Sequence, residues 1–448
     1  MLTPDQARTI AEQLVEQATS AGATAADAML AADASSSVSV RLGELEDVSR
    51  SEGQEIGLRV FDGQRSASVS SSDLSPEALA ELVQRAVAMA REAPEDPFAG
   101  LAPAELLLQG ERPDVDSFDP AEPAPSALRA RASAAESAAR GVAGVTNSNG
   151  GSASASASII ALATSGGFSG AYRASGHSTS ASVVAGEGSA MQRDYAYHSA
   201  RHLSDLEDAE AIGRRAGERA AARVGSSKVA PGRMPVLFDP RVATSLLGHL
   251  VSAINGAVIA RQTSFLLGKL GERIFAPGIT VHDDPLRVRG LRSRPFDGEG
   301  LPSRATNLVD DGVLTTWLAD SAAARQLGIA PTGHAARGIG GAPGASPSNL
   351  TLLAGRRSRE ELLAACPRAI LVTELIGQGV NGVTGDYSRG AAGFLVTDGE
   401  IGAPVSEITI ASNLLEMFAT LEPASDLEIR RGIDAPTILV PEMTVASA

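Results

Sequence analysis

The sequence has little of several residue types, and each shortage narrows what the protein can be. It contains a single cysteine, Cys366, so no disulfide can form within the chain. Aromatic residues make up 3% of the total, so the cores are expected to consist mainly of Ala, Val, Leu and Ile. Lysine occurs only at Lys228 and Lys269, beside 36 arginines, which leaves few candidates for a catalytic lysine. No apolar run approaches the length of a membrane span and no signal pattern opens the chain, so a cytoplasmic protein is expected.

Acidic residues outnumber basic ones. The 448 residues include 53 Asp and Glu against 38 Lys and Arg, which gives a net charge of −15. One basic run, from Arg287 to Arg294, is followed directly by Asp297 and Glu299. A chain of this charge is poorly suited to bind nucleic acid or an anionic membrane, so neither is expected as a partner.

The first 92 residues are predicted to form a compact N-terminal α+β domain. Two amphipathic helical patterns enclose a group of strand patterns, with a hairpin turn predicted at Asp62-Gly63. The expected elements are a helix from Pro4, strands at 37–42, 56–60 and 65–70, and a helix from Pro76. Residues 93–125 contain seven prolines and many acids, and are predicted to be an extended connector.

Residues 126–225 are predicted to be an antiparallel sheet region flanked by helices. Within it, the run Ser152–Ser158 alternates strictly between serine and alanine. This run could be a flexible linker of low complexity. Antiparallel strands are favoured, because the alternation continues into Ile159-Ile160 and glycine turns follow.

Residues 226–448 are predicted to form a strand-rich C-terminal domain. Strand patterns recur there with Asp-Gly turns at Asp311-Gly312 and Asp398-Gly399. A barrel or a curved sheet would accommodate so many strands. The predicted fold class is therefore α+β, with an N-terminal α+β region followed by the strand-rich domain.

The segment Thr373–Phe394 is the most unusual part of the sequence. It contains six glycines interleaved with Gln378, Asn381, Asp386, Tyr387, Ser388 and Arg389. Glycine allows positive φ and close backbone approach at an entropic cost, so we predict that this loop contacts peptide or a partner through those six residues. An array of tight turns that only packs the domain is the alternative. The G-x-G-x-x-G pattern at 377–382 does not indicate a dinucleotide site, because no helix follows it.

Six long motifs carry a resemblance to a known family. They lie at 188–201, 294–300, 320–328, 373–394, 405–414 and 440–443. They resemble the TldD/PmbA family, in its TldE (PmbA) branch, over nearly the whole chain. The resemblance implies a cytosolic bacterial protease system, in which a TldD subunit carries zinc and a TldE subunit completes a heterodimer. It also implies that the substrates are unfolded or ribosomally made peptides.

The same resemblance implies a zinc motif, H-E-x-x-x-H on a helix, in the active branch, with a cysteine near the C-terminus. In this chain the corresponding helix is predicted to begin at Asp239-Pro240, and the motif positions fall at Leu247, Gly248 and Ser252. These residues provide neither the ligand pair nor the base that zinc hydrolysis needs. His249 is out of register, and residues 430–440 contain no cysteine. No catalytic residue, metal or cofactor is expected in this chain, and zinc is expected in the partner.

The remaining histidines and the cysteine are expected to be structural. His198 and His202 are four residues apart, but they follow a strand pattern, so the end of a strand is favoured over a metal-binding pair. His282 stands before Asp-Asp-Pro, which favours a turn that ends a strand. Cys366 is interpreted as a small buried residue.

The sequence therefore predicts a TldE-like, non-catalytic subunit of a heterodimeric zinc metalloprotease. It would pair with a TldD-like zinc subunit, help to form a chamber, and hold extended peptide, a task that is commonly performed by strand addition. Two alternatives stay open. The first is an autonomous homodimeric peptidase with an unrecognised site. The second is a regulatory protein-binding protein, since part of the family carries the historical label of DNA gyrase modulator.

Overall fold

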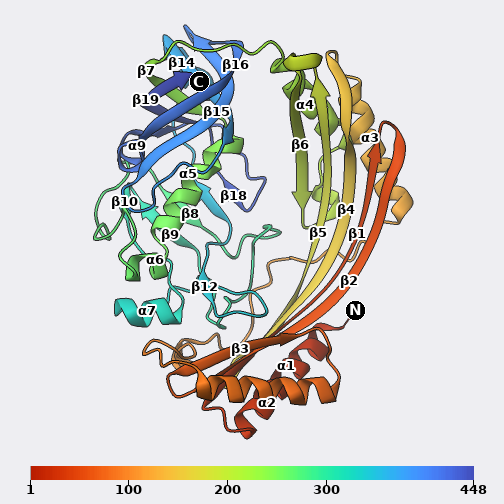
Figure 1. Cartoon of the computed structure of the whole chain (residues 1–448), viewed down its shortest axis with the longest axis vertical. Coiled ribbons are helices and arrows are strands. Elements are labelled where there is room, and N and C mark those ends of the chain that lie inside the picture. Colours follow the sequence, from red (N-terminus) through yellow and green to blue (C-terminus); the bar gives the residue numbers. More distant parts are fainter. Residues whose placement is uncertain (1, 448) are drawn as a thin grey trace.

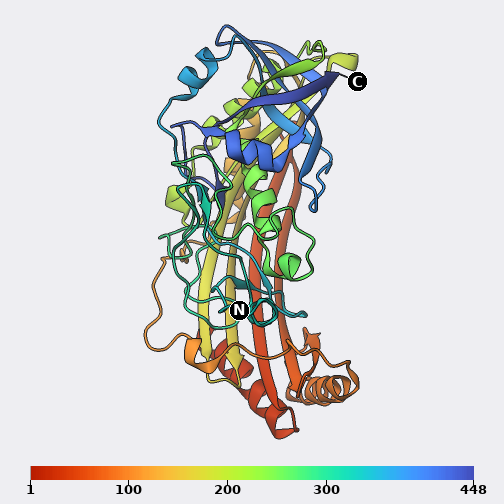
Figure 2. The ribbon, with the colours of Figure 1, turned by 90° about the vertical axis from the view of Figure 1, so that its left-hand side faces the viewer.

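The computed structural model describes residues 2–447 and has two halves that face each other (Figure 1). The N-terminal half is one long curved sheet with helices on its outer side, and the C-terminal half contains a barrel and a smaller sheet. Seen from the side, the C-terminal half lies in front of the long strands (Figure 2). The predicted α+β class with a strand-rich C-terminal domain is confirmed.

The long sheet has six antiparallel strands in the order β3-β2-β1-β4-β5-β6. They are β1 (Ala25–Arg41), β2 (Glu44–Asp62), β3 (Arg65–Ser71), β4 (Val145–Thr164), β5 (Ser169–Ala185) and β6 (Gln192–Ala200). The serine-alanine run lies in β4, so the strand prediction for Ser152–Ser158 is confirmed. The predicted hairpin at Asp62-Gly63 is also present, between β2 and β3.

Four helices cover one face of this sheet. They are α1 (Pro4–Ser20), α2 (Pro76–Glu92), α3 (Pro125–Arg140) and α4 (Ala209–Ala222). Side chains alternate along a strand, so Ala28 and Leu30 of β1 pack toward α1 and α2. Met29, between them, packs on the opposite side, the concave face, with Phe168 and Phe296. The concave face is therefore the one that meets the C-terminal half.

A single buried carboxylate holds the turn between β1 and β2. Leu42 and Gly43 both have positive φ, 53° and 85°, which is the geometry of the two-residue hairpin turns that match strand twist. Glu136 of α3 is 1% exposed and accepts hydrogen bonds from the backbone nitrogens of Leu42, at 2.6 Å, and Gly43, at 3.0 Å. The tip of this hairpin is thus fixed to α3.

Residues 93–124 connect the two helical pairs, and pass from contacts with the C-terminal half to the sheet. Their one regular element is the short 3₁₀ turn Ala104–Leu106. The backbone nitrogen of Ser175 in β5 donates to the carbonyl of Ser117 at 2.9 Å, and Asp119 accepts from the backbone of Leu203 at 2.7 Å. These bonds attach the segment to the sheet.

Five strands of the C-terminal half close into a barrel in the order β16-β15-β14-β7-β19, because β16 also pairs with β19. The strands are β7 (Gly232–Phe238), β14 (Arg368–Ile376), β15 (Asp386–Thr397), β16 (Glu400–Asn413) and β19 (Ile438–Ser447), and β17 (Glu422–Pro423) adds to β19. The helices of this half are α5 (Pro240–Ala253), α6 (Gly256–Ala260), α7 (Ser321–Leu327), α8 (Arg359–Ala364) and α9 (Leu414–Thr420). No helix in residues 2–447 has the length and apolar character needed to cross a bilayer.

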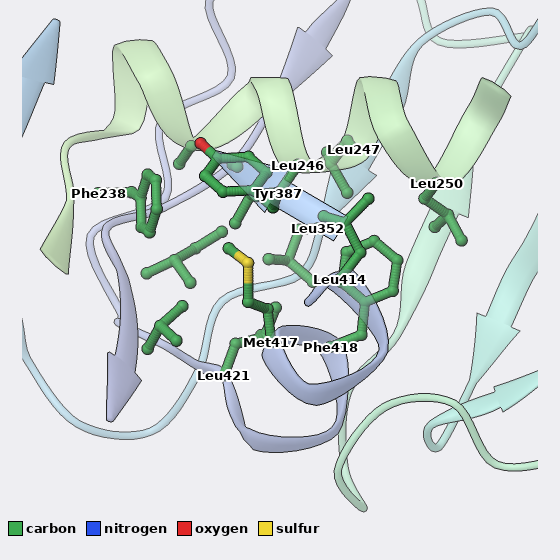
Figure 3. Close-up of a cluster of buried hydrophobic side chains, with 14 of the residues drawn as sticks. Phe238, Leu246, Leu247, Leu250, Leu352, Tyr387, Leu414, Met417, Phe418 and Leu421 are labelled. Atoms are coloured by element: carbon green, nitrogen blue, oxygen red, sulfur yellow. The ribbon is translucent and has the colours of Figure 1, made fainter. Parts of the chain in front are cut away.

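The smaller sheet lies beside the barrel and has the order β10-β9-β8-β13-β18. Its strands are β8 (Val281–Asp283), β9 (Thr306–Asp310), β10 (Val313–Leu314), β13 (Leu350–Leu352) and β18 (Ile433–Asp434), and β11 (Ala335–Ala336) pairs separately with β12 (Gly344–Ala345). The apolar core that α5 and α9 share with the barrel is shown in Figure 3. There, Leu247 and Leu250 of α5 belong to one buried cluster with Met417 and Phe418 of α9.

A buried ion cluster joins the two halves. Asp27 of β1, 2% exposed, accepts a hydrogen bond from Nε of Arg59 at 3.0 Å and pairs with Arg337 of the C-terminal half. Close by, the backbone of β2 touches the same segment: a Cβ on Gly57 would lie 1.7 Å from the carbonyl oxygen of Ile339. Only glycine fits there, so the backbone of the C-terminal segment packs directly against the concave face.

Glu299 lies near this joint and is 5% exposed. Burial raises the pKa of Glu299 to about 7, although hydrogen bonds from the backbone and hydroxyl of Ser321 oppose the rise. Because the folded chain holds this proton more tightly than the unfolded chain does, Glu299 favours folding fully only below its ordinary pKa. That contribution is lost as the pH rises toward 7, and amounts to about 3 kcal/mol at most.

The Glu299→Gln variant is therefore expected to unfold with a weaker dependence on pH between 5 and 8, and to be more stable than the parent chain at pH 8. Glutamine keeps an acceptor oxygen for Ser321 but carries no charge. Urea unfolding at several pH values measures this, with Glu81→Gln on the exposed side of α2 as the control. Equal pH slopes for the parent chain and Glu299→Gln would show that Glu299 does not titrate in this range.

Candidate functional site

Helix α5 begins as the sequence predicts. Asp239 caps it, accepting a hydrogen bond from the backbone of Arg241 at 3.2 Å, and Pro240 occupies the first helical position. Leu247 faces the core and is 2% exposed, Gly248 is half-buried, and Ser252 is exposed. The Ser252 hydroxyl donates back to the carbonyl of Gly248 at 2.9 Å, a bond within the helix.

These three positions do not form a zinc site. The side chains at 247, 248 and 252 provide none of the His, Cys, Asp or Glu groups that hold zinc. The first position is inside the hydrophobic core and the last is in solvent. In residues 2–447, no group of three or more His, Cys, Asp and Glu side chains is placed to hold a metal ion. The donor set that zinc requires does not fit here.

His249 points from α5 toward the ring of Tyr387. The two rings meet edge to face with their centroids 5.9 Å apart, and Nε2 of His249 is buried without a hydrogen-bond partner. Burial, with a smaller effect of the nearby Arg389 charge, lowers the pKa of His249. A neutral imidazole packed on an aromatic ring is consistent with a structural role.

The glycine-rich segment is a compact turn, stabilised by its own side chains. Asn381 Oδ1 accepts from the backbone of Val383 at 2.9 Å and of Thr384 at 3.2 Å. Asp386 accepts from the hydroxyl of Thr384 at 2.6 Å and from the amide of Asn413 at 3.3 Å, and these bonds lower its pKa. The side chains of Asn381 and Asp386 are thus already engaged in holding the turn.

The other four predicted contact residues are placed differently. Gln378 and Ser388 are exposed. Tyr387 is 1% exposed, and burial raises the pKa of Tyr387 to about 12, so it packs the core and is not available as a surface contact. The physical reason is that β15 begins at Asp386, so residues 386–389 alternate between faces, and Tyr387 points inward. Arg389 is half-buried and lines a cavity of about 260 Å³.

Replacing Asp386 by alanine is expected to loosen this turn. The hydrogen bonds from Thr384 and Asn413 would be lost, which should lower the free energy of unfolding only slightly, since the site is exposed. The Asp386→Asn variant keeps an acceptor oxygen and should lose less. Urea unfolding and proteolysis within 377–385 measure the change. An unaltered stability for Asp386→Ala, combined with lost peptide binding, would instead assign Asp386 to a contact surface.

The histidine pair does not converge. Nδ1 of His198, on β6, accepts from the backbone of Glu207 at 3.1 Å, while Nε2 of His202 lies 3.0 Å from the carbonyl of Asp116. His282, on β8, pairs with Asn307 at 2.7 Å. Cys366 is 2% exposed, as predicted. Each of these side chains has a local structural partner.

The structure places a larger, charged cavity between the two halves, where β6 and α4 meet α5, α8 and the segment around β18. Its volume is about 590 Å³. It is lined by Tyr195, Tyr197, Arg215, Arg219, Asp239, Arg241, Thr244, Arg359, Glu360, Asp426, Glu428, Arg430, Arg431 and Asp434. The 260 Å³ cavity that contains Arg389 adjoins it, since Tyr195 and Arg241 line both.

Aromatic rings and arginines face each other in this cavity. The rings of Tyr195 and Tyr197 are stacked with centroids 6.3 Å apart, and they are 51% and 38% exposed. The guanidinium of Arg241 lies 5.9 Å from the Tyr195 ring, and that of Arg431 lies 5.6 Å from the Tyr197 ring. Flat amphipathic rings with adjacent fixed cations can hold the backbone carbonyls, carboxylates and side chains of a peptide.

One buried carboxylate organises this wall. Asp194 of β6, 2% exposed, accepts two hydrogen bonds from Arg241, at 2.7 and 3.0 Å, and one from Arg223 at 3.4 Å. Burial alone would raise the pKa of Asp194, but the bonds and charge of Arg241 outweigh it and hold the pKa below its ordinary value. Arg223 also pairs with Glu374 of β14, so the network bridges the halves.

Among the described residues, Arg219 lacks the ion pair that Arg215, Arg241, Arg359 and Arg430 each have. Its contact is a long hydrogen bond, 3.4 Å, to the carbonyl of Tyr195, and within residues 2–447 no acid lies within ion-pairing distance of it. Burial and the nearby Arg241 charge lower the pKa of Arg219, the direction expected of a cation that lacks an anion. Arg219 is therefore a cation of the cavity with unsatisfied pairing capacity.

Sequence reasoning missed this cavity. In the sequence, Tyr195 and Tyr197 belong to the strand pattern that precedes His198, and Arg241 follows the predicted helix start at Asp239-Pro240 without a pattern of its own. The alternation of tyrosine and alanine at 195–197 was the one available signal, since it places both rings on one face of a strand. The arginines carried no signal, because their convergence depends on how the two halves meet.

Comparison with protein families and known proteins gives consistent results along the chain. Three successive segments of the chain match family models described as PmbA/TldA metallopeptidase domains. Residues 26–90 match domain 1, residues 118–224 match the central domain, and residues 231–447 match the C-terminal domain. The metalloprotease PmbA of Escherichia coli O157:H7 is 41% identical over 412 residues, which are 92% of this chain and 89% of that protein.

Two solved structures share the fold over almost their full lengths. A protein of Bacteroides thetaiotaomicron, described as a candidate modulator of DNA gyrase, has a TM-score of 0.91 and 27% identity, and 100% of each chain is covered. TldE from Thermococcus kodakarensis has a TM-score of 0.86 at 23% identity, with 97% of this chain and 99% of that chain covered.

Proposed function

The chain belongs to the TldD/PmbA metallopeptidase family, in its PmbA/TldE branch, and we propose that it is the non-catalytic subunit of a two-chain zinc peptidase. In this proposal it pairs with a related, zinc-bearing TldD-like subunit in the cytoplasm. The pair degrades or processes unfolded and ribosomally made peptides. This chain supplies part of the chamber wall and of the surface that holds extended peptide.

The state of α5 is the observation that carries the proposal. The helix that the resemblance matches to the zinc-bearing helix of the active branch is capped and packed, but Leu247 is part of the core, and Gly248 and Ser252 offer no zinc ligand (Figure 3). Loss of ligands with retention of the fold is expected of a subunit that acts through its shape and surfaces. An autonomous zinc peptidase would need a donor set that residues 2–447 do not assemble.

The cavity between the halves is the part of this chain that we assign to peptide. Tyr195 and Tyr197 offer flat apolar surface with polar tips, which suits side chains of many kinds. Arg219 offers a charged donor that no acid within residues 2–447 occupies. Such a surface would hold a peptide chain with little sequence preference, as a degrading enzyme requires.

Co-expression with a TldD-like partner tests the proposal. We expect a stable complex on size-exclusion chromatography, near one zinc per pair by metal analysis, and hydrolysis of an unfolded peptide by the complex. The isolated chain is expected to show neither chelatable zinc nor hydrolysis. Separate elution of the two chains, or zinc-dependent hydrolysis by this chain alone, would overturn the proposal and favour an autonomous peptidase.

A further inference from the structure

The long sheet has an unpaired edge. Strand β2 spans Glu44–Asp62, but β3 pairs only with its second part, from Ile56 to Asp62. Residues 44–55 therefore have a neighbouring strand, β1, on one side only, and all of them are exposed. An open edge of this length is a template for another strand.

The helical layer also stops short of this edge. Helix α3 packs on β1, β4 and β5, where Val38 and Val40 are buried against Leu128. The cross-strand partners of these valines on β2 are Val48 and Leu45, which are 52% and 43% exposed. Directly paired residues share a face of the sheet, so Leu45 and Val48 continue the buried apolar stripe beyond the helix that covers it.

A hollow lies next to the same edge. Its volume is about 250 Å³, and Val38, Val48, Phe118 and Leu128 are among the residues that line it. A space of this size can receive a large apolar side chain from a partner, the kind of anchor that dominates many interfaces. The hairpin that presents the edge is fixed at its tip by Glu136, so little order would have to be gained on binding.

We propose that residues 44–55 of β2 are the docking edge for the partner subunit, which adds a strand here and continues the six-stranded sheet across the interface. An apolar side chain of the partner fills the hollow beside Val48, and apolar groups of the partner cover Leu45. This inference rests on the proposed two-chain function and assigns the surface at which the two chains meet.

Charge selects which chain can dock. Residues 44–55 contain five acids and one arginine, a formal charge of −4. A second copy would bring a strand of the same charge alongside. In the antiparallel register that overlaps the whole segment with itself, Glu44 would lie opposite Glu55 and Asp47 opposite Glu52, which is destabilising. The docked strand is therefore one that carries basic residues, which favours a heterodimer over a homodimer.

Hydrogen exchange of the intact complex with the TldD-like partner tests this assignment. We expect backbone amides in 44–55 to exchange at least about tenfold more slowly in the complex than in the isolated chain, because half of them gain strand partners. Amides of β6, at the other edge of the sheet, are the internal reference and should not change. The Leu45→Lys/Val48→Lys double variant should weaken complex formation about tenfold or more. Its matched control, Met89→Lys, alters a 48% exposed side chain of α2 and should have no effect.

The outcomes separate this inference from the proposed function. If a complex forms without slower exchange in 44–55, and the double variant binds normally, the docking edge is wrong while the two-chain function stands. If no complex forms at all, both are overturned. Slower exchange in 44–55 of the isolated chain at high concentration would show that a second copy docks there, and would overturn the assignment to a basic partner strand. Circular dichroism of the variants confirms that they are folded.

Discussion

Replacing Leu247 by histidine, the first step in rebuilding a zinc motif on α5, is expected to destabilise the C-terminal domain by about 3 kcal/mol or more. The side chain is 2% exposed and packs with the core cluster that includes Met417 and Phe418. A histidine there removes apolar contacts and buries a polar ring without a partner. Urea unfolding measures the loss. Leu247→Met, which conserves volume, is the control and should cost less than about 1.5 kcal/mol.

A change at the next residue, Gly248, is expected to increase stability. A Cβ on Gly248 would meet no atom within 4 Å, so Gly248→Glu should fold normally and gain up to about 1 kcal/mol from a better helix residue. Neither variant, nor the two combined with Ser252→His, is expected to retain chelatable zinc. A combined variant that holds one zinc per chain with little loss of stability would contradict this, because it would show that these positions of α5 can still form a metal site.

Truncation of Asp194 is expected to have the second large effect. Asp194→Ala leaves Arg241 buried without its anion and removes one of the two carboxylates that Arg223 contacts; stranding a buried charge typically costs about 3–5 kcal/mol. The variant should unfold at a lower urea concentration and lose the cavity wall, so the complex should also lose activity. Asp194→Asn keeps the shape of the side chain and one acceptor oxygen. Its stability and activity should therefore fall between those of the parent chain and those of Asp194→Ala.

The Arg219→Ala variant tests whether the cavity binds peptide, without the loss of stability that is expected for Asp194→Ala. Arg219 has no acid partner within residues 2–447, so its loss should change stability by less than about 1 kcal/mol. If the cavity holds peptide, the KM of the complex should rise about tenfold with kcat nearly unchanged, as for a lost contact to a charged group. An unchanged KM for Arg219→Ala would place peptide elsewhere and leave Asp194 with a purely structural role.

Much of the fold could be predicted because its signals are local. The cap at Asp239, the alternation at Ser152–Ser158 and the turn at Asp62-Gly63 each depend on a few adjacent residues, and all three are present. The closure of the barrel depends on β16 pairing with β19, whose partners, such as Ile410 and Val445, are far apart in the sequence. No local pattern specifies such a pairing.

The candidate site could be predicted only in part. The glycine-rich composition of 373–394 suggested one continuous loop, but β15 starts inside it at Asp386 and turns Tyr387 into the core. The side chains of Asn381 and Asp386 stabilise the turn itself, which local hydrogen-bonding preference could have suggested. The cavity that includes Asp194 and Arg241 requires two halves of the molecule to meet, and sequence distance conceals that contact.

The central claim, that this chain completes a zinc-bearing partner, is tested most directly by titration. Purified chain is added to a fixed amount of the TldD-like subunit, and hydrolysis of an unfolded peptide is followed. The account predicts that the rate rises with added chain and reaches a plateau at one chain per partner, while either protein alone is nearly inactive. A rate that does not depend on the added chain, or equal hydrolysis by this chain without the partner, would contradict it.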